Sequence, residues 1–166
     1  MGPVTAFLED DVVARGDRQT VARELAQLYP DDHGRIRAFE DGSGRIADLD
    51  YREALREPEP AGRGRPRLGV VAREVTLLPV HWEWLGQQRG GASAVLRRLV
   101  DEARRREPGA GEKRDSAYRF MSHMCGDRPG YEEALRALYR GEQERFRNLV
   151  ADWPPAIRDY LGELLA

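Results

Sequence analysis

The chain has 166 residues, of which 40 % are hydrophobic and 34 % are charged, and its formal net charge at pH 7 is −2. It contains one cysteine, Cys125, and no run of about 18 apolar residues, which excludes an intrachain disulfide and predicts no membrane span. The first residues carry acids where a secretory signal would carry basic side chains, so we expect a cytoplasmic protein of one domain or two to three small subdomains.

Residues 1–56 are predicted to form a small β-β-α-β-β module. Weak alternation of apolar and polar residues on both sides of an acidic turn predicts an N-terminal hairpin. Asp17 can cap the helix that follows. Two strands are expected at 36–39 and 45–49, joined by the turn 41–44. Glycine supplies the positive φ that such a turn needs, and no helix follows it as a phosphate-binding loop would require.

The segment 61–106 concentrates positive charge in a chain that is otherwise acidic. It holds ten arginines and four acidic residues. Apart from histidine, every basic residue of the chain except Lys113 is arginine, the side chain best suited to phosphates and base edges. One basic block in an acidic background is a candidate nucleic-acid footprint.

Residues 57–69 form a predicted linker, because three prolines and three glycines interrupt any apolar periodicity. Its Arg-Gly-Arg-Pro core resembles the AT-hook. That resemblance implies that Arg63 and Arg65 lie along the narrow, strongly negative minor groove of A·T-rich DNA, and that Gly64 allows the close approach. Pro66 would direct the chain out of the groove, and Arg67 would add a contact. A solvated basic linker is the alternative reading of these residues.

Residues 70–106 begin with a β-rich run that ends at Pro79, which is well placed to start a helix. A Gly90-Gly91 break precedes a second helix, for which Ser93 is the expected N-cap. This order of elements, with its apolar-apolar-Arg-x-apolar-apolar core, resembles the ribbon-helix-helix DNA-binding fold. The resemblance implies that two copies pair their strands into a ribbon that enters the major groove. The apolar seam would include Leu85, Val95, Leu96 and Leu99.

The same resemblance implies a phosphate site at Gly91, Ala92 and Ser93, where the second helix begins. The residues that would face the bases depend on the strand register, which the sequence leaves open. One register directs Arg73 toward DNA, and the other directs Thr76 and Glu74. Both depart from the family's apolar-in, polar-out alternation, so we expect weak base reading.

Residues 112–166 are predicted to form a bundle of four short amphipathic helices, because apolar stripes at helical spacing recur between glycine and proline breaks. Such stripes indicate core rather than a ligand site. The predicted fold class is therefore α+β, with an N-terminal β-β-α-β-β module, a central ribbon-helix-helix-like unit and a C-terminal bundle of short helices.

No catalytic centre, cofactor or metal is predicted. His123 and Cys125 are two candidate metal ligands, fewer than a zinc site usually needs, and the other histidines lie in separate segments. Cys125 as a nucleophile would need a base and an oxyanion site close in space. An enzyme using His123 or Cys125 would need these side chains at the wall of a concave pocket.

Longer stretches resemble an uncharacterised bacterial family that is catalogued only as a domain of unknown function. They are GRGRPRLGVVAREVTLLPVHWEWL, GGASAVLRRLVDEARR, YRFMSHMCGDRPGYEEALRALYRGEQERF and a closing ADWP. The resemblance runs nearly end to end and is strongest from Gly62 to Trp153. It implies a bacterial cytoplasmic protein and brings no activity and no catalytic residues.

From these patterns we expect a homodimeric DNA-binding protein, such as a transcriptional regulator or an antitoxin-like partner. The dimer would form through residues 70–105, and the flanking modules would sense a ligand or bind a protein. The alternative is a protein-interaction scaffold in which the ribbon-helix-helix-like unit serves only to dimerise.

Overall fold

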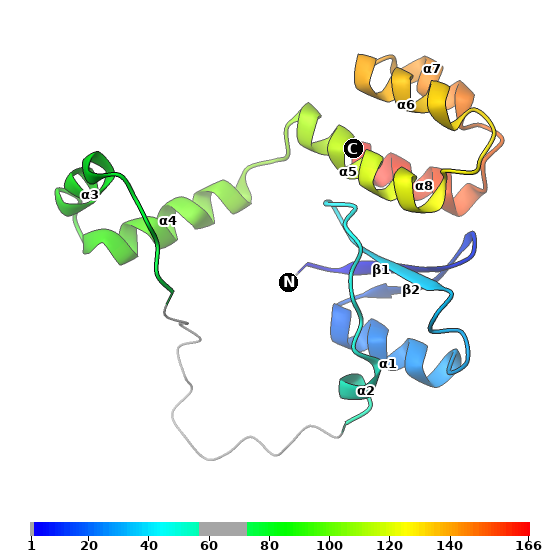
Figure 1. Ribbon diagram of the computed structural model, residues 1–166, viewed down its shortest axis with the longest axis horizontal. Coiled ribbons are helices and arrows are strands. Elements are labelled where there is room, and N and C mark those ends of the chain that lie inside the picture. The colour runs from blue at the N-terminus through cyan, green and yellow to red at the C-terminus, as the bar shows by residue number, and fades with distance from the viewer. Residues whose placement is uncertain (1, 57–72) are drawn as a thin grey trace. The chain divides into compact units, whose positions relative to one another are not determined.

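The computed structural model describes residues 2–56 and 73–166 and confirms the α+β class (Figure 1). The chain divides into a compact unit, residues 1–57 and 108–166, and a central unit, residues 58–107. The sequence analysis treats residues 1–56 and 112–166 as separate modules, and the structure places both in the compact unit. The predicted arm residues Arg63, Gly64, Arg65, Pro66 and Arg67 lie outside the described residues.

The described residues contain three strands and eight helices. In chain order they are β1 (Val4–Leu8), β2 (Asp11–Gly16), α1 (Arg18–Leu28), β3 (Ile36–Glu40), α2 (Tyr51–Ala54), α3 (Pro79–Gly86), α4 (Gly91–Arg105), α5 (Ala110–Met124), α6 (Tyr131–Arg140), α7 (Gln143–Leu149) and α8 (Pro155–Leu165).

The sheet is antiparallel with strand order β2-β1-β3, and it is covered on both faces (Figure 1). Val4 and Ala6 of β1 pack in one buried cluster with α1, and Phe7 packs in a second cluster with α5 and α8. The alternation seen in the sequence is weak because β1 is the central strand and its side chains are buried on both faces. The predicted hairpin is confirmed.

Asp17 caps α1 as predicted. Its carboxylate accepts hydrogen bonds from the backbone N–H groups of Gln19 and Thr20, at 3.1 and 3.0 Å. Hydrogen bonds to Thr20 and Gln19 stabilise the charged carboxylate and therefore lower the pKa of Asp17.

The predicted fourth strand at 45–49 is wrong. Only one bridge forms there, between Phe39 and Ile46. The pairing with β3 ends at Ala47, whose backbone N–H donates to the Ala38 carbonyl at 2.8 Å, and Ala47 and Leu49 are buried in the cluster that packs against α1. The short helix α2 follows, capped by the side chain of Asp50, and the sequence analysis does not predict it.

The four predicted C-terminal helices are confirmed as α5 to α8, and their core is shared with the sheet. Phe120 and Tyr160 meet Phe7 with ring centroids 5.4 Å apart in each case, and Phe39 meets Phe120 at 5.0 Å. The Asp41 carboxylate accepts hydrogen bonds from Thr5 at 2.8 Å and from the Tyr160 hydroxyl at 3.1 Å. Sheet and tail are therefore one packed body.

The turn that follows β3 docks on α5. Ser116 Oγ donates to the Gly42 carbonyl at 2.9 Å, and Arg119 donates to the Ser43 carbonyl at 3.0 Å. Gly44 has φ +62°, and a Cβ added there would lie 2.1 Å from the main-chain oxygen of Ser116. Glycine is thus required at this position both by the backbone and by the approach of α5.

The central unit is a helix pair in its described part. Leu85 of α3 and Val95 of α4 are its buried residues, and the predicted break at Gly90-Gly91 is confirmed. Ser93 as N-cap is wrong: α4 begins at Gly91, because the left-handed Gly90 already turns the chain into the helix. Residues 73–78 of the predicted strand form no strand in the single chain.

Two glycine substitutions in the turn after β3 should differ in their effect on stability. Gly42 and Gly44 both have positive φ, so alanine at either position costs about 1–2 kcal/mol. At Gly42 the added Cβ meets nothing within 4 Å, whereas at Gly44 it overlaps the backbone of Ser116. We expect Gly44→Ala to lower the free energy of unfolding by about 1–3 kcal/mol more than Gly42→Ala, measured by urea denaturation. Equal losses would show that the turn does not rest on α5.

Candidate functional site

The predicted DNA-binding residues that the structure describes all lie in the central unit. Arg73 and Thr76 have exposed side chains in the segment before α3. Gly91, Ala92 and Ser93 form the first turn of α4, where backbone N–H groups lack acceptors within the helix. The structure thus brings the three helix residues together, and no described contact joins them to Arg73 or Thr76.

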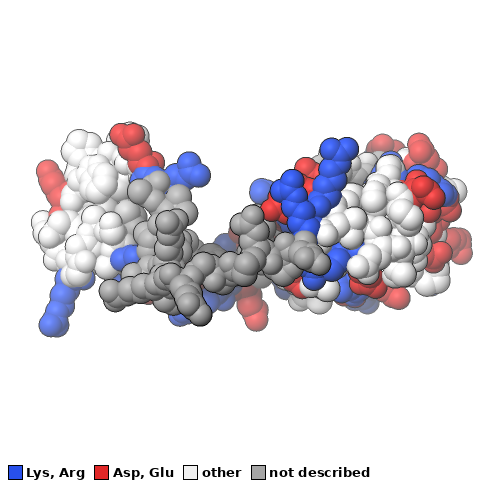
Figure 2. Space-filling view, turned by 90° about the horizontal axis from the view of Figure 1, so that it is seen from below, with Lys and Arg blue, Asp and Glu red and all other residues white. Residues whose placement is uncertain are grey.

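In the described part of the central unit, large hydrophobic residues are more often exposed than buried. Residues Val75, Leu78, Val80, Trp82, Trp84, Leu99 and Val100 are all exposed, with Leu78 at 62 % and Val80 at 60 %. Figure 2 shows this part of the surface, at the left, as mainly uncharged, with charged side chains projecting from its edges. Clustered exposed hydrophobic side chains are typical of an interaction surface.

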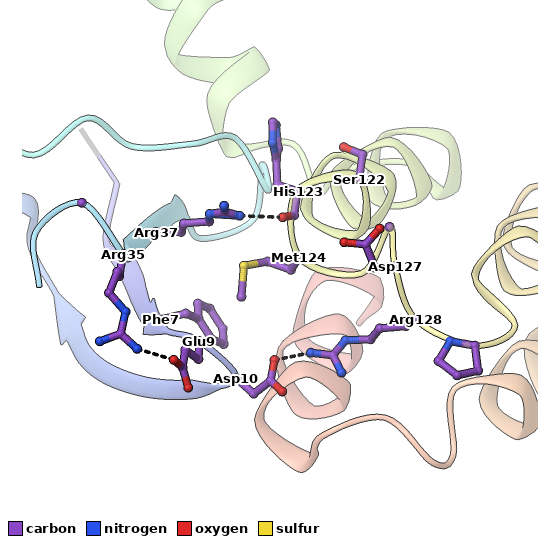
Figure 3. A pocket seen from close by; sticks show the side chains of 13 residues that line it. Phe7, Glu9, Asp10, Arg35, Arg37, Ser122, His123, Met124, Asp127 and Arg128 are labelled. Atoms are coloured by element: carbon purple, nitrogen blue, oxygen red, sulfur yellow. Dashed lines mark hydrogen bonds and ion pairs between the residues drawn. The ribbon is translucent and has the colours of Figure 1, made fainter.

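A polar pocket of about 830 Å³ lies on the compact unit, among the β1–β2 turn, the start of β3 and the end of α5 (Figure 3). Its charged side chains are Glu9, Asp10, Arg35, Arg37, Asp127 and Arg128, and His123 also lines it. Arg35 pairs with Glu9 and Asp32, and hydrogen bonds to these two carboxylates raise the pKa of Arg35.

The remaining arginines of the pocket are also engaged. Arg128 pairs with Asp10, and Arg37 donates to the main-chain oxygen of His123 at 3.0 Å (Figure 3). Glu9 adopts φ +54° in the hairpin turn, an uncommon conformation for a residue other than glycine, asparagine or aspartate. Each arginine that lines the pocket is therefore held by an ion pair or a hydrogen bond within the protein.

His123 and Cys125, the candidate catalytic or metal-binding side chains of the sequence analysis, differ in their access to solvent. His123 lines the pocket, whereas Cys125 is fully buried beneath it. Burial raises the pKa of the Cys125 thiol to about 12, an effect that the nearby charge of Arg128 only partly offsets. Ser122, the hydroxyl residue lining the pocket, donates to the Arg119 carbonyl at 2.8 Å and not to the His123 ring. The described pocket therefore holds no activated nucleophile.

Within the described ranges, no three histidine, cysteine, aspartate or glutamate side chains gather closely enough to hold a metal ion. None of the helices in those ranges combines the length and apolar character that crossing a bilayer requires.

The sequence analysis misses the pocket because its residues come from segments far apart in the chain. Arg35 and Arg37 lie next to β1 in space through sheet pairing, yet Arg37 reaches a main-chain oxygen 86 positions away. The local signals are the acidic turn predicted at Asp10-Asp11, which the structure places at Glu9-Asp10, and the Gly-Asp-Arg-Pro-Gly loop after α5. Each signal marked a loop, and neither could indicate the other.

The comparisons with known proteins concern the whole chain. A family model described as "Uncharacterized protein conserved in bacteria (DUF2239)" matches residues 3–165. The chain belongs to this family. No curated protein and no solved structure matches it. Membership confirms the resemblance to an uncharacterised bacterial family, and it brings no catalytic or binding residues to the pocket or to the central unit.

The buried thiol should be unreactive in the folded protein. With a pKa raised by about three units, the thiolate fraction at neutral pH falls about a thousandfold, so a disulfide reagent should label Cys125 at least that much more slowly than in denaturant. The raised pKa also favours folding below about pH 9, and this stability is lost as the pH rises from about 9 to about 12. Cys125→Ala should lack this alkaline component. Rapid labelling of the native protein would contradict the burial.

Proposed function

We propose that the protein is a homodimer that binds DNA, with the central unit as dimerisation element and the basic arm as DNA contact. The dimer forms through residues 70–105. The observation that supports this proposal most strongly is the exposed apolar surface of the central unit. Its helix pair has the order of elements and the apolar pattern that resemble the ribbon-helix-helix fold.

A helix pair with two buried apolar residues has too small a core to be stable alone. Pairing with a second copy would cover the exposed side chains of Leu99 and Val100 on α4 and of Val80 on α3. Residues 73–78 pair with none of the strands that the structure describes and are exposed except for the half-buried Leu77, so their backbone groups are available for a ribbon. Both features support an assembly in which two copies complete one another.

The charge of the central unit supports DNA as the partner of that dimer. Arg73, Arg89, Arg97 and Arg105 are exposed. Arg98 pairs with Glu102 at 3.4 Å, an exposed pair that costs little to break. The first turn of α4 adds backbone N–H groups that can receive a phosphate.

The contribution of the arm can be measured through salt dependence. Each phosphate contact contributes about 0.9 to the slope of log K against log salt. The triple substitution of Arg63, Arg65 and Arg67 to alanine should therefore reduce the slope by up to about 2.7 for an A·T-rich duplex, measured by fluorescence anisotropy.

A matched control removes the same charge from the tail helices by replacing Arg136, Arg140 and Arg145 with alanine. These three form exposed ion pairs in the compact unit, and the slope should stay unchanged. Equal slopes for the arm variant and the wild type would remove the arm from the proposal.

A dimerisation scaffold without DNA affinity is the second candidate. The exposed carboxylate of Glu74 favours it, because in one register this side chain would face phosphates.

The dimer itself is tested by sedimentation of the full chain. Leu99→Asp should convert a dimer into a monomer, because it would place a charge in the buried seam. Arg97→Asp, on the polar side of the same helix, should leave the dimer intact. A monomeric wild type would overturn both candidates, and a dimer without DNA affinity would favour the scaffold.

A further inference from the structure

A second groove of the compact unit is lined by residues of α5, α6, α7 and α8. Figure 1 shows these helices as two pairs, α5 with α8 and α6 with α7. The volume of the groove is about 650 Å³, within the range of small-molecule sites. It is separate from the polar pocket at the β1–β2 turn.

The floor of this groove is apolar. It is formed by Leu138 of α6, Phe146 of α7, Val150, and Leu161 of α8, all of which are buried. Gly162 lies beside them in α8, and a Cβ added there would meet nothing within 4 Å. A glycine inside a helix is unfavourable relative to alanine, so its presence in the lining keeps the groove open at a cost in helix stability.

The charged side chains that line the groove are all cations: Lys113, Arg114, Arg147 and Arg158. Ala166, the last residue of the sequence, also lines the groove and already engages Lys113. Arg114 Nη1 would lie 3.8 Å from a Cβ added at Gly141, so this guanidinium reaches from α5 to the end of α6. Lys113 Nζ donates to the main-chain oxygen of Ala166 at 2.6 Å. Among the residues that the structure describes, no carboxylate forms an ion pair with Arg114, Arg147 or Arg158.

Some other arginines of the compact unit, by contrast, are paired with carboxylates. In the polar pocket Arg35 and Arg128 are each paired with carboxylates, and on α7 Arg145, two positions from Arg147, pairs with Glu142 at 3.1 Å. Apolar floor and cationic rim together are complementary to a ligand with one anionic end and an aliphatic body. Guanidinium groups favour carboxylates because they can form two parallel hydrogen bonds.

We propose that this groove binds a small amphiphilic anion, namely a carboxylate carried on an unbranched aliphatic chain. The chain lies on the floor formed by Leu138, Phe146, Val150 and Leu161, and the carboxylate lies among the arginines at the rim. This site does not depend on DNA binding, because its residues all belong to the compact unit.

The test is isothermal titration of the full-length protein with sodium decanoate and dodecanoate, below their micelle concentrations and at constant ionic strength. Binding should saturate at one site. Each added methylene should tighten binding by about threefold to fourfold, so dodecanoate should bind about tenfold more tightly than decanoate. Decanol, which has the same chain and no charge, should bind at least about tenfold more weakly than decanoate.

Two pairs of variants locate the site. A Cβ at Gly162 meets nothing within 4 Å, so Gly162→Leu should fold, and its side chain at the lining should abolish binding, whereas Gly111→Leu, an open helical glycine outside the lining, should not change it. Replacing Arg147 and Arg158 with glutamine should weaken binding about tenfold, at about threefold for each exposed charge. Replacing Arg136 and Arg145 with glutamine is the matched control and should have no effect.

Circular dichroism of each variant is the control that tests whether the fold is retained. The proposal is overturned if neither acid binds saturably, if decanol binds as tightly as decanoate, or if folded Gly162→Leu retains full affinity. Binding of an acidic amphipathic peptide without binding of either acid would also overturn it.

Discussion

The packing of Phe7 and Phe39 against Phe120 and Tyr160 is the interaction on which the compact unit depends. The rings meet at centroid distances from 4.7 to 6.1 Å, mostly edge to face. A three-stranded sheet covered by one helix would leave its other face in water, and these rings close that face. The carboxylate of Asp41 fixes the arrangement at the edge of the cluster, because it accepts from both β1 and α8.

Local elements could be predicted from the sequence where a single short pattern determines them. The hairpin follows from alternation, the start of α1 from Asp17, and the start of α3 from Pro79. The fourth strand could not be excluded, because residues 45–47 do hydrogen-bond to β3 and no local pattern shows that this pairing ends at Ala47. Ser93 is a reasonable cap by composition, but the left-handed Gly90 is the N-cap of α4, three residues earlier.

The candidate sites divide along the same line. The predicted DNA-binding residues form contiguous motifs, and those that the structure describes are exposed in the central unit except for the half-buried Ala92. The paired charges around Arg35 and Arg128, and the unpaired cations around Arg147, join segments distant in sequence. Their meeting depends on sheet register and helix packing, which no local pattern encodes. A single basic residue such as Arg158 is indistinguishable in the sequence from any other solvated arginine.

Because the core is shared between the two ends of the sequence, it can be completed only late in synthesis. Phe7 and Phe39 emerge early in synthesis, but Phe120, which meets both rings, emerges about 80 residues after Phe39, and Tyr160 follows about 40 residues later. At about 5–20 residues per second, the nascent sheet waits for several seconds or more with one aromatic face uncovered, while the whole central unit is made. Packing between residues so far apart in the sequence slows folding. Until it is complete, the hydrophobic face of the sheet is exposed and can bind chaperones.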